Sequence, residues 1–191
     1  KVSSTITPTV GKPALPTANP DTTSGPKGAT QSINLITNVD GADAAGQAGV
    51  SLVASSVKLC GVGEVSPNCT KTSVVVSGVG SYSVNASGVM SFVPEANFTG
   101  TPAPLAYTVL DSTGQKAAST YTPTVVVPPV ANPDTTVGKQ GEPQVINLLT
   151  NPDGTDLAAT DGATLDPTTV KLCGLDEISP NCTQTTVDVP G

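Results

Sequence analysis

The chain has 191 residues, a formal net charge of −7 and only 8 Lys and Arg residues, which disfavours binding to nucleic acid or to an anionic membrane surface. No apolar run approaches the ~20 residues that span a bilayer, and the chain has no His, the commonest general acid–base group of enzymes. Val and Thr are β-formers, while 19 Gly and 18 Pro supply turns. The composition therefore predicts an all-β fold with many short strands and argues against an enzyme.

The strands predicted over the first 127 residues are short, and several alternate in hydrophobicity. Ile33 and Leu35 share one face of the first strand, and Met90 and Phe92 share one face of a later one. All five aromatic residues fall between positions 82 and 121, so this part should supply the bulkiest core residues. Seven or eight strands in ~110 residues is typical of a β-sandwich. In chain order, the predicted strands are residues 31–37, 55–61, 72–78, 80–86, 89–95, 105–111 and 116–127.

The chain repeats itself at an offset of 113 residues. Residues 18–78 align without a gap with residues 131–191, and 35 of the 61 positions are identical. This period is the size of an independent β-sandwich and exceeds the ~20–50 residues of a solenoid unit. We therefore expect tandem β-sandwich repeat domains, in three segments: residues 1–14 as the last strand of a preceding repeat plus a linker, residues 15–127 as a complete repeat, and residues 128–191 as a linker plus the first half of the next repeat.

A second frame is compatible with the same repeats. The run STITPTV (residues 4–10) resembles STYTPTV (residues 119–125), so a unit can also be drawn that begins with this strand. The partners of the strand at 119–125 distinguish the two frames. In either frame nothing repeats residues 79–115, and the second copy has too thin a core to offset the entropy of ordering its backbone. We expect it to be part of a longer array or to be completed by a neighbouring molecule.

Each copy carries two cysteines, in VKLCGVGEVSPNCT (residues 57–70) and VKLCGLDEISPNCT (residues 170–183). A zinc site needs four ligands, and a redox pair is more often Cys-x-x-Cys. A disulfide that closes a hairpin loop in each repeat is the favoured interpretation, joining Cys60 to Cys69 and Cys173 to Cys182; reduced thiols are the alternative. Disulfides predict an oxidising compartment.

Four aspartates are weak candidates for a Ca²⁺ site. The runs NVDGAD and NPDGTD each place two carboxylates three residues apart beside an Asn, a donor set that hard cations accept. Turn formation is the favoured role, because Asp and Asn hydrogen-bond their own backbone in glycine-rich turns. No cofactor is predicted. The four candidates are Asp40, Asp43, Asp153 and Asp156.

Several runs in order resemble the CshA-type fibril repeat of bacterial cell-surface fibrillar adhesins, over nearly the whole chain. They are ANPDTT (18–23), INLITN (33–38), GSYSV (80–84), GVMSFVPEANFTGT (88–101), AYTVLDSTGQ (106–115) and STYTPTV (119–125). The resemblance implies tandem β-sandwiches that form the stalk of a long fibril, with adhesion placed mainly in a separate, non-repetitive region.

The leading functional hypothesis is therefore structural: repeat domains of an extracellular fibril or adhesin stalk on a bacterial surface, whose partners are neighbouring repeats. The Pro-rich junctions at residues 11–21 and 125–134 favour semi-rigid spacers. The alternative is a binding module in which the repeats engage a host surface protein, glycan, matrix component or neighbouring fibre. A hydrolase is disfavoured, because the chain has no His and no G-x-S-x-G motif.

Overall fold

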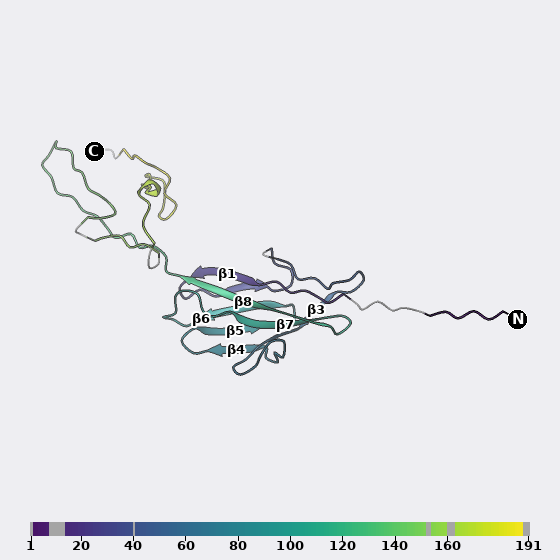
Figure 1. Ribbon diagram of the computed structural model, residues 1–191. Coiled ribbons are helices and arrows are strands. Elements are labelled where there is room, and N and C mark those ends of the chain that lie inside the picture. Colours follow the sequence, from purple (N-terminus) through teal and green to yellow (C-terminus); the bar gives the residue numbers. More distant parts are fainter. Residues whose placement is uncertain (1, 8–13, 40, 152–153, 160–162, 189–191) are drawn as a thin grey trace. The chain divides into compact units, whose positions relative to one another are not determined.

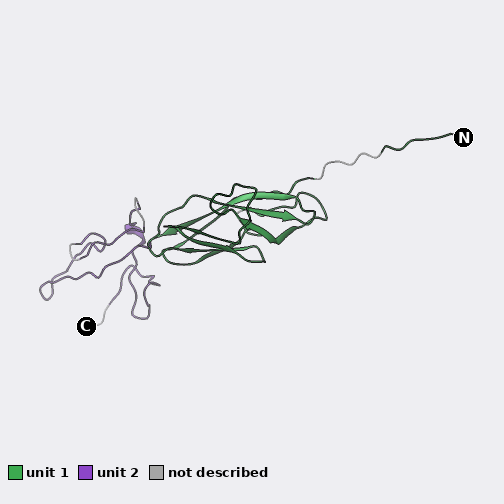
Figure 2. Ribbon diagram, turned by 90° about the horizontal axis from the view of Figure 1, so that it is seen from below, with its two compact units in different colours: residues 1–126 green, residues 127–191 purple. Residues whose placement is uncertain are grey.

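The computed structural model describes residues 2–7, 14–39, 41–151, 154–159 and 163–188. The chain divides into two compact units, residues 1–126 (unit 1) and residues 127–191 (unit 2), coloured separately in Figure 2. Every strand that the structure describes belongs to unit 1, and the all-β prediction is confirmed. The described part of unit 2 contains isolated bridges and one 3-10 turn, η1 (Pro167–Thr169). Within the described ranges no helix has the length and apolar character to cross a membrane.

Unit 1 is built from eight strands that form two four-stranded sheets (Figure 1). The strands are β1 (Asp21–Pro26), β2 (Gln31–Asn34), β3 (Leu52–Leu59), β4 (Ser73–Val76), β5 (Gly80–Val84), β6 (Val89–Pro94), β7 (Leu105–Asp111) and β8 (Lys116–Val126). One sheet has the order β1-β8-β7-β3, and the other has the order β2-β6-β5-β4. The predicted sandwich is the observed architecture.

The two halves of unit 1 take different places in these sheets. The strands β1 to β4, from residues 21–76, are all edge strands, whereas β5 to β8, from residues 80–126, are all central. Each edge strand pairs with a strand of the other half: β1 with β8, β2 with β6, β3 with β7 and β4 with β5. The first half of the repeat therefore depends on the second half for its sheet hydrogen bonds.

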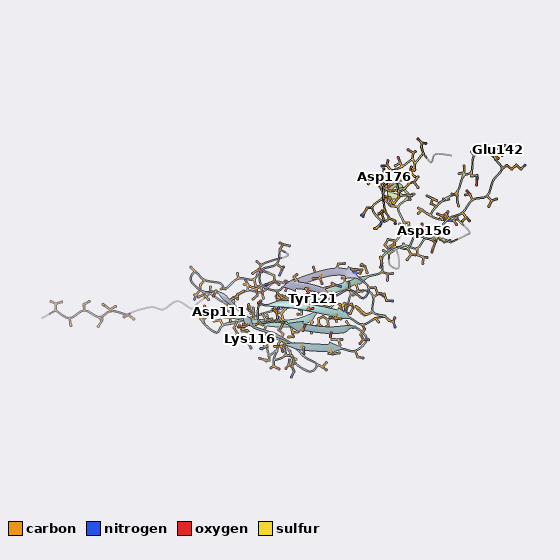
Figure 3. The ribbon with its side chains drawn as sticks, turned by 180° about the vertical axis from the view of Figure 1, so that it is seen from behind. Asp111, Lys116, Tyr121, Glu142, Asp156 and Asp176 are labelled. Atoms are coloured by element: carbon orange, nitrogen blue, oxygen red, sulfur yellow. A yellow bond between two sulfur atoms is a disulfide. The ribbon has the colours of Figure 1, made fainter. Side chains whose placement is uncertain are left out.

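Aromatic side chains from the central strands fill the space between the sheets. The rings of Tyr82 and Phe92 lie 4.7 Å apart between centroids, and Tyr121 meets Tyr82 edge-on at 6.2 Å. Figure 3 labels Tyr121 among the strands of unit 1. Such offset and edge-on pairs are the geometry that aromatic rings favour. Leu35 of the first half packs against this cluster and is fully buried. Leu59 is also fully buried, and Val57 is 2 % exposed.

Strand β1 is the one strand that the sequence does not predict. Its residues, DTTSGP, have no apolar alternation, and it forms as a parallel edge to β8, with Asp21 opposite Tyr121 and Pro26 opposite Val126. Strand β8 contains residues 119–125 and also pairs with β7. These residues thus pair inside the sandwich of residues 21–126, which is the arrangement that the frame of residues 15–127 requires. The domain boundaries themselves stay a prediction.

The predicted strand of a preceding repeat lies at the start of the chain. Residues 2–7 are exposed and form no strand, and residues 8–13 lie outside the described residues. The glycine-rich stretch at residues 41–49 contains turns and bends rather than a helix. Residues 2–7 and 41–49 contribute no side chain to the hydrophobic core of unit 1.

Candidate functional site

The cysteine loop of unit 1 joins the two sheets. A disulfide connects Cys60, directly after β3, to Cys69, shortly before β4, with an S–S distance of 2.02 Å and a Cα–Cα distance of 4.1 Å. Because β3 and β4 belong to different sheets, the loop connects the two sheets and not two neighbouring strands of one sheet. One antiparallel bridge, between Leu59 and Lys71, closes the base of the loop. The disulfide therefore holds two edge strands of opposite sheets together.

A carboxylate, that of Glu64, organises the backbone of this loop. Glu64 accepts hydrogen bonds from the backbone N–H of Gly61 at 2.8 Å and of Thr70 at 3.2 Å, and from the Thr70 hydroxyl. The Thr70 hydroxyl bond and the Gly61 N–H bond lower the pKa of Glu64 below its usual value of 4.5. The ionised carboxylate thus fixes the loop from inside, next to the disulfide.

Unit 2 contains the same loop. Cys173 and Cys182 form a disulfide with a Cα–Cα distance of 4.2 Å. Glu177 accepts from the N–H of Gly174 at 2.8 Å, from the N–H of Thr183 at 3.1 Å and from the Thr183 hydroxyl. The Thr183 hydroxyl bond is the main cause that lowers the pKa of Glu177 to about 2. The structure leaves no free cysteine among the described residues.

Of the four aspartates considered for Ca²⁺, two are described. Asp43 accepts the backbone N–H of Asn19 at 2.8 Å, and Asp156 accepts the backbone N–H of Asn132 at 2.7 Å. The positions Asp40 and Asp153 lie outside the described residues. Across the ranges that the structure covers, no group of three or more His, Cys, Asp or Glu is placed to hold a metal ion. Each of these two carboxylates therefore binds the backbone of a segment 24 residues earlier in the chain.

Asp43 also belongs to an acidic cluster that the sequence analysis did not identify. The Tyr107 hydroxyl from β7 lies 3.3 Å from Asp43 Oδ2 and donates to the Asn19 carbonyl at 3.2 Å. Asp21, fully buried, accepts a hydrogen bond from the Asn38 side chain. Burial raises the pKa of Asp43 from 3.8 to about 6; the charge of Asp21 adds to this, and the hydrogen bonds from Asn19 and Tyr107 oppose it. Burial likewise raises the pKa of Tyr107 well above its usual value of 10.

A second polar network joins β1, β2 and β8. The Thr23 hydroxyl donates to Gln31 Oε1 and contacts the Tyr121 hydroxyl at 2.7 Å, and Gln31 Nε2 donates to the Thr124 carbonyl at 3.0 Å. Gly25 makes room for the glutamine, since a Cβ there would stand 3.0 Å from Gln31 Cγ. This network satisfies a buried glutamine amide between the two sheets.

One signal in the sequence points to both networks. Their residues from the first half recur at the same offset in the second copy, although DTTSG reads as a turn rather than as a buried strand. The pairs are Asp21 and Asp134, Thr23 and Thr136, Gly25 and Gly138, Gln31 and Gln144, Asn38 and Asn151, and Asp43 and Asp156.

With this geometry established, comparison with known proteins identifies the family. The family model of the surface adhesin CshA repetitive domain matches residues 13–125. The chain belongs to this family. The match covers the strands of unit 1 almost completely and ends one residue before the end of β8. No curated protein and no solved structure is significantly similar to the chain. In this chain the surface adhesin CshA repetitive domain is a two-sheet sandwich with a disulfide in the loop between its sheets.

Proposed function

We propose that the chain is a segment of the stalk of an extracellular bacterial fibril or adhesin, in which each repeat spaces an adhesive region away from the cell surface. The observation that carries this proposal is the parallel pairing of the first strand, β1, with the last strand, β8. In a sandwich with this pairing the chain enters at one end and leaves at the other. Tandem copies are then added end to end.

The two ends of unit 1 can be followed along β8. Near the start of β8, the Gln115 side chain lies 3.4 Å from the carbonyl oxygen of Ala14, at the entry of the chain. The chain leaves unit 1 after Val126, the last residue of β8. Over its 11 residues, at about 3.3 Å per residue, β8 spans about 35 Å between entry and exit. Each complete repeat therefore adds a fixed length to the chain, which is what a stalk requires.

The disulfide fits an exposed position on a cell surface. It connects β3 and β4, which are edge strands of different sheets, so that neither edge can separate from the other at this loop. Disulfides persist in oxidising compartments such as the extracellular space. The proposed partners are neighbouring repeats of the same chain or fibre, and the proposed role is mechanical rather than enzymatic.

Solution scattering on chains of increasing repeat number tests the stalk proposal. Chains with one, two and three copies of residues 14–130 should increase in maximum dimension by a constant increment, about 35–40 Å per added copy. Copies that collapse on one another would instead give a particle whose dimension rises with roughly the cube root of mass. That second outcome would contradict the proposal.

One observation favours a second candidate function, a binding role for the repeats themselves. The disulfide loop presents apolar residues to solvent at matching positions of the two copies: Val62 and Val65 are 92 % and 75 % exposed, and Leu175 and Ile178 are 71 % and 82 % exposed. Rigid exposed apolar groups are a means of binding another protein. Replacing Val62 and Val65 by Asp should abolish adhesion to host matrix proteins if this loop binds them, with unfolding unchanged. Unchanged adhesion favours the stalk role alone.

A further inference from the structure

The first and the last strand of unit 1 lie side by side and run in the same direction. Strand β1 pairs in parallel with β8 over all six of its residues, and Asp21 at its start lies opposite Tyr121 (Figure 1). The backbone N–H of Lys27 continues this pairing with a hydrogen bond of 2.7 Å to the carbonyl of Val126, the last residue of β8. A pull on the two ends of unit 1 therefore draws β1 toward its first residue and β8 toward its last.

Opposite pulls on two parallel neighbours load their pairing in shear. The hydrogen bonds of a parallel ladder are evenly spaced along the strands, so sliding one strand past the other strains all of them at once. Peeling the same two strands apart from one end would break these bonds one after another. The pairing of β1 with β8 thus meets tension along the chain in the direction in which its hydrogen bonds act together.

Strand β8 is held on its other side as well. It pairs antiparallel with β7, and near its end Val125 exchanges two backbone hydrogen bonds with Gly100, of 2.7 Å and 2.9 Å. The hydroxyl of Thr124 lies 2.8 Å from that of Thr101. Among the strands that the structure describes, β1 is an edge strand and neighbours β8 alone. Under tension the sheets should therefore yield first between β1 and β8.

A buried side-chain network resists the same sliding motion. The Thr23 hydroxyl of β1 lies 2.7 Å from the Tyr121 hydroxyl of β8 and donates to Oε1 of Gln31. Gln31, from β2 of the other sheet, donates through Nε2 to the Thr124 carbonyl of β8 at 3.0 Å. A slip of one residue moves β1 by about 3.3 Å and separates these groups. Because Gln31 and Tyr121 are buried, they would then lack hydrogen-bond partners, which costs free energy.

We propose that β1, β8 and the network of Thr23, Gln31 and Tyr121 form a mechanical clamp, through which each complete repeat bears tension without unfolding. The disulfide of Cys60 and Cys69 joins β3 to β4 and lies outside this load path, so the clamp is non-covalent. A clamp is useful in a stalk under tension, and in this respect the inference rests on the proposed function. Scattering tests the spacing of the repeats and force tests the clamp, so either can fail alone.

A change in the direction of pull tests the clamp in single-molecule force spectroscopy of the full chain of 191 residues. When the chain is held at its two termini, the pairing of β1 with β8 is loaded in shear. When it is held at the C-terminus and at a handle on Thr30, an exposed residue between β1 and β2, the pairing is opened from the end where β1 and β8 both finish. We expect a rupture force several times lower in the second arrangement, and equal rupture forces overturn the proposal.

The disulfide of unit 1 identifies its rupture in these measurements. In the Cys60→Ser, Cys69→Ser double variant the loop of 9 residues is free to extend. The length gained when unit 1 unfolds should then increase by about 30 Å, at up to ~3.6 Å per residue. The event that lengthens in this way is the one whose rupture force is compared.

Two matched variants locate the load. Thr23→Val removes the hydroxyl at the centre of the network and should raise the unfolding rate under tension roughly tenfold. Ser56→Ala removes a hydroxyl from the opposite edge of the same sheet, where Ser56 accepts the N–H of Leu110 at 2.8 Å and donates to the Val53 carbonyl at 2.6 Å. Both variants should lower the free energy of unfolding at equilibrium, but Ser56→Ala should leave the rupture force unchanged. If Ser56→Ala lowers that force as much as Thr23→Val, or if neither lowers it, the load does not pass through the clamp and the proposal is wrong.

Discussion

Residues 18–78 and the described part of residues 131–191 are copies of one repeat with different structures. They share 35 of 61 positions, yet the first copy contains four strands and the described part of the second contains none. Figure 2 shows the two units in separate colours, and every strand of the described residues lies in unit 1. Two differences accompany this contrast. The first copy pairs with the central strands β5 to β8, and the second copy has Asp166 and Pro167 where β3 has Val53 and Ala54, at the start of the 3-10 turn η1.

The contacts that the two copies share are short in sequence, and those that differ are long. The disulfide loop spans 9 residues and the contact of Asn19 with Asp43 spans 24, and both have counterparts in unit 2. The pairing of Asp21 with Tyr121 spans 100 residues and has none. Long-range pairings bring an entropic cost of loop closure that only a completed core offsets. Every strand of the first half is an edge strand, so no two strands of that half are hydrogen-bonded neighbours. The first half therefore contains no sheet of its own.

The largest effect is expected from removing the central strands. A chain that ends after Gly78 should lose β1 to β4 together, because each of them pairs only with a strand from residues 80–126. Circular dichroism should show no cooperative melt, whereas a control chain that ends after Val127 should melt cooperatively. A cooperative transition in the shorter chain would mean that the first half carries its own sheet, and the comparison above would fail.

Replacing leucine by alanine at matched positions of the two copies should lower the free energy of unfolding by unequal amounts. Leu35 is fully buried in the core of unit 1, so Leu35→Ala should lower the free energy of unfolding by about 2–5 kcal/mol through lost packing and a cavity. Leu148, its counterpart, packs against no second half, so Leu148→Ala should change stability by less than about 0.5 kcal/mol. Denaturant unfolding of both variants measures the difference. Equal costs would show that unit 2 has a packed core of its own.

Breaking the disulfide should have a smaller effect. In the chain-entropy model a loop of 9 residues gains about 2–3 kcal/mol from its cross-link, so the Cys60→Ser, Cys69→Ser double variant should lower the stability of unit 1 by that amount. The matched double variant, Cys173→Ser and Cys182→Ser, should leave the unfolding of unit 1 unchanged. Peptide mapping without reductant should find both pairs within their own loops. A link between Cys60 and Cys173 or Cys182 would contradict one disulfide per repeat.

The features that the sequence predicts well are local ones. The runs with apolar alternation, such as the pair Met90 and Phe92, became β2 and β4 to β8 with ends shifted by a few residues, and β3 begins three residues earlier than expected. Two features depend on partners far along the chain and were not predictable in this way. Strand β1 has no apolar pattern and exists because β8 offers it a parallel edge. The loop after β3 reads as a hairpin, but its flanking strands pair elsewhere.

The acidic cluster of Asp21 and Asp43 was not predicted for the same reason, because it also depends on partners far along the chain. Asp43 reads as a turn residue because its neighbours are Gly and Ala, but its carboxylate accepts the backbone N–H of Asn19, 24 residues earlier in the chain. Its raised pKa comes from burial beside Asp21 and Tyr107, which β1 and β7 bring to it. Sequence reasoning finds the turn but not the partners that bury it.

The smallest predicted effect is a pH dependence of unit 1 that originates at Asp43. Its pKa is about 6 in the folded state and 3.8 as the ordinary value, so folding favours the protonated carboxyl. The stabilisation is complete below about pH 4 and is lost as pH rises through about 6. Because the side chain is only half-buried, solvent screening reduces the contribution to about 1 kcal/mol.

Asp43→Asn isolates this contribution, because an amide oxygen can still accept the Asn19 N–H while the side chain no longer ionises. Relative to the native chain, the variant should gain about 1 kcal/mol in unfolding free energy between pH 4 and pH 7.5 in denaturant titrations. Carboxylates with lowered pKa values, such as Glu64 and Asp111, lose stability in the opposite direction as pH falls, but they are present in both proteins and cancel in the difference. Asp156→Asn is the matched control: Tyr107 buries Asp43 only in the complete sandwich, so this variant should leave the pH profile of unit 1 unchanged. If the native chain and Asp43→Asn have the same pH profile, Asp43 is not held in a desolvated site by the second half of the repeat.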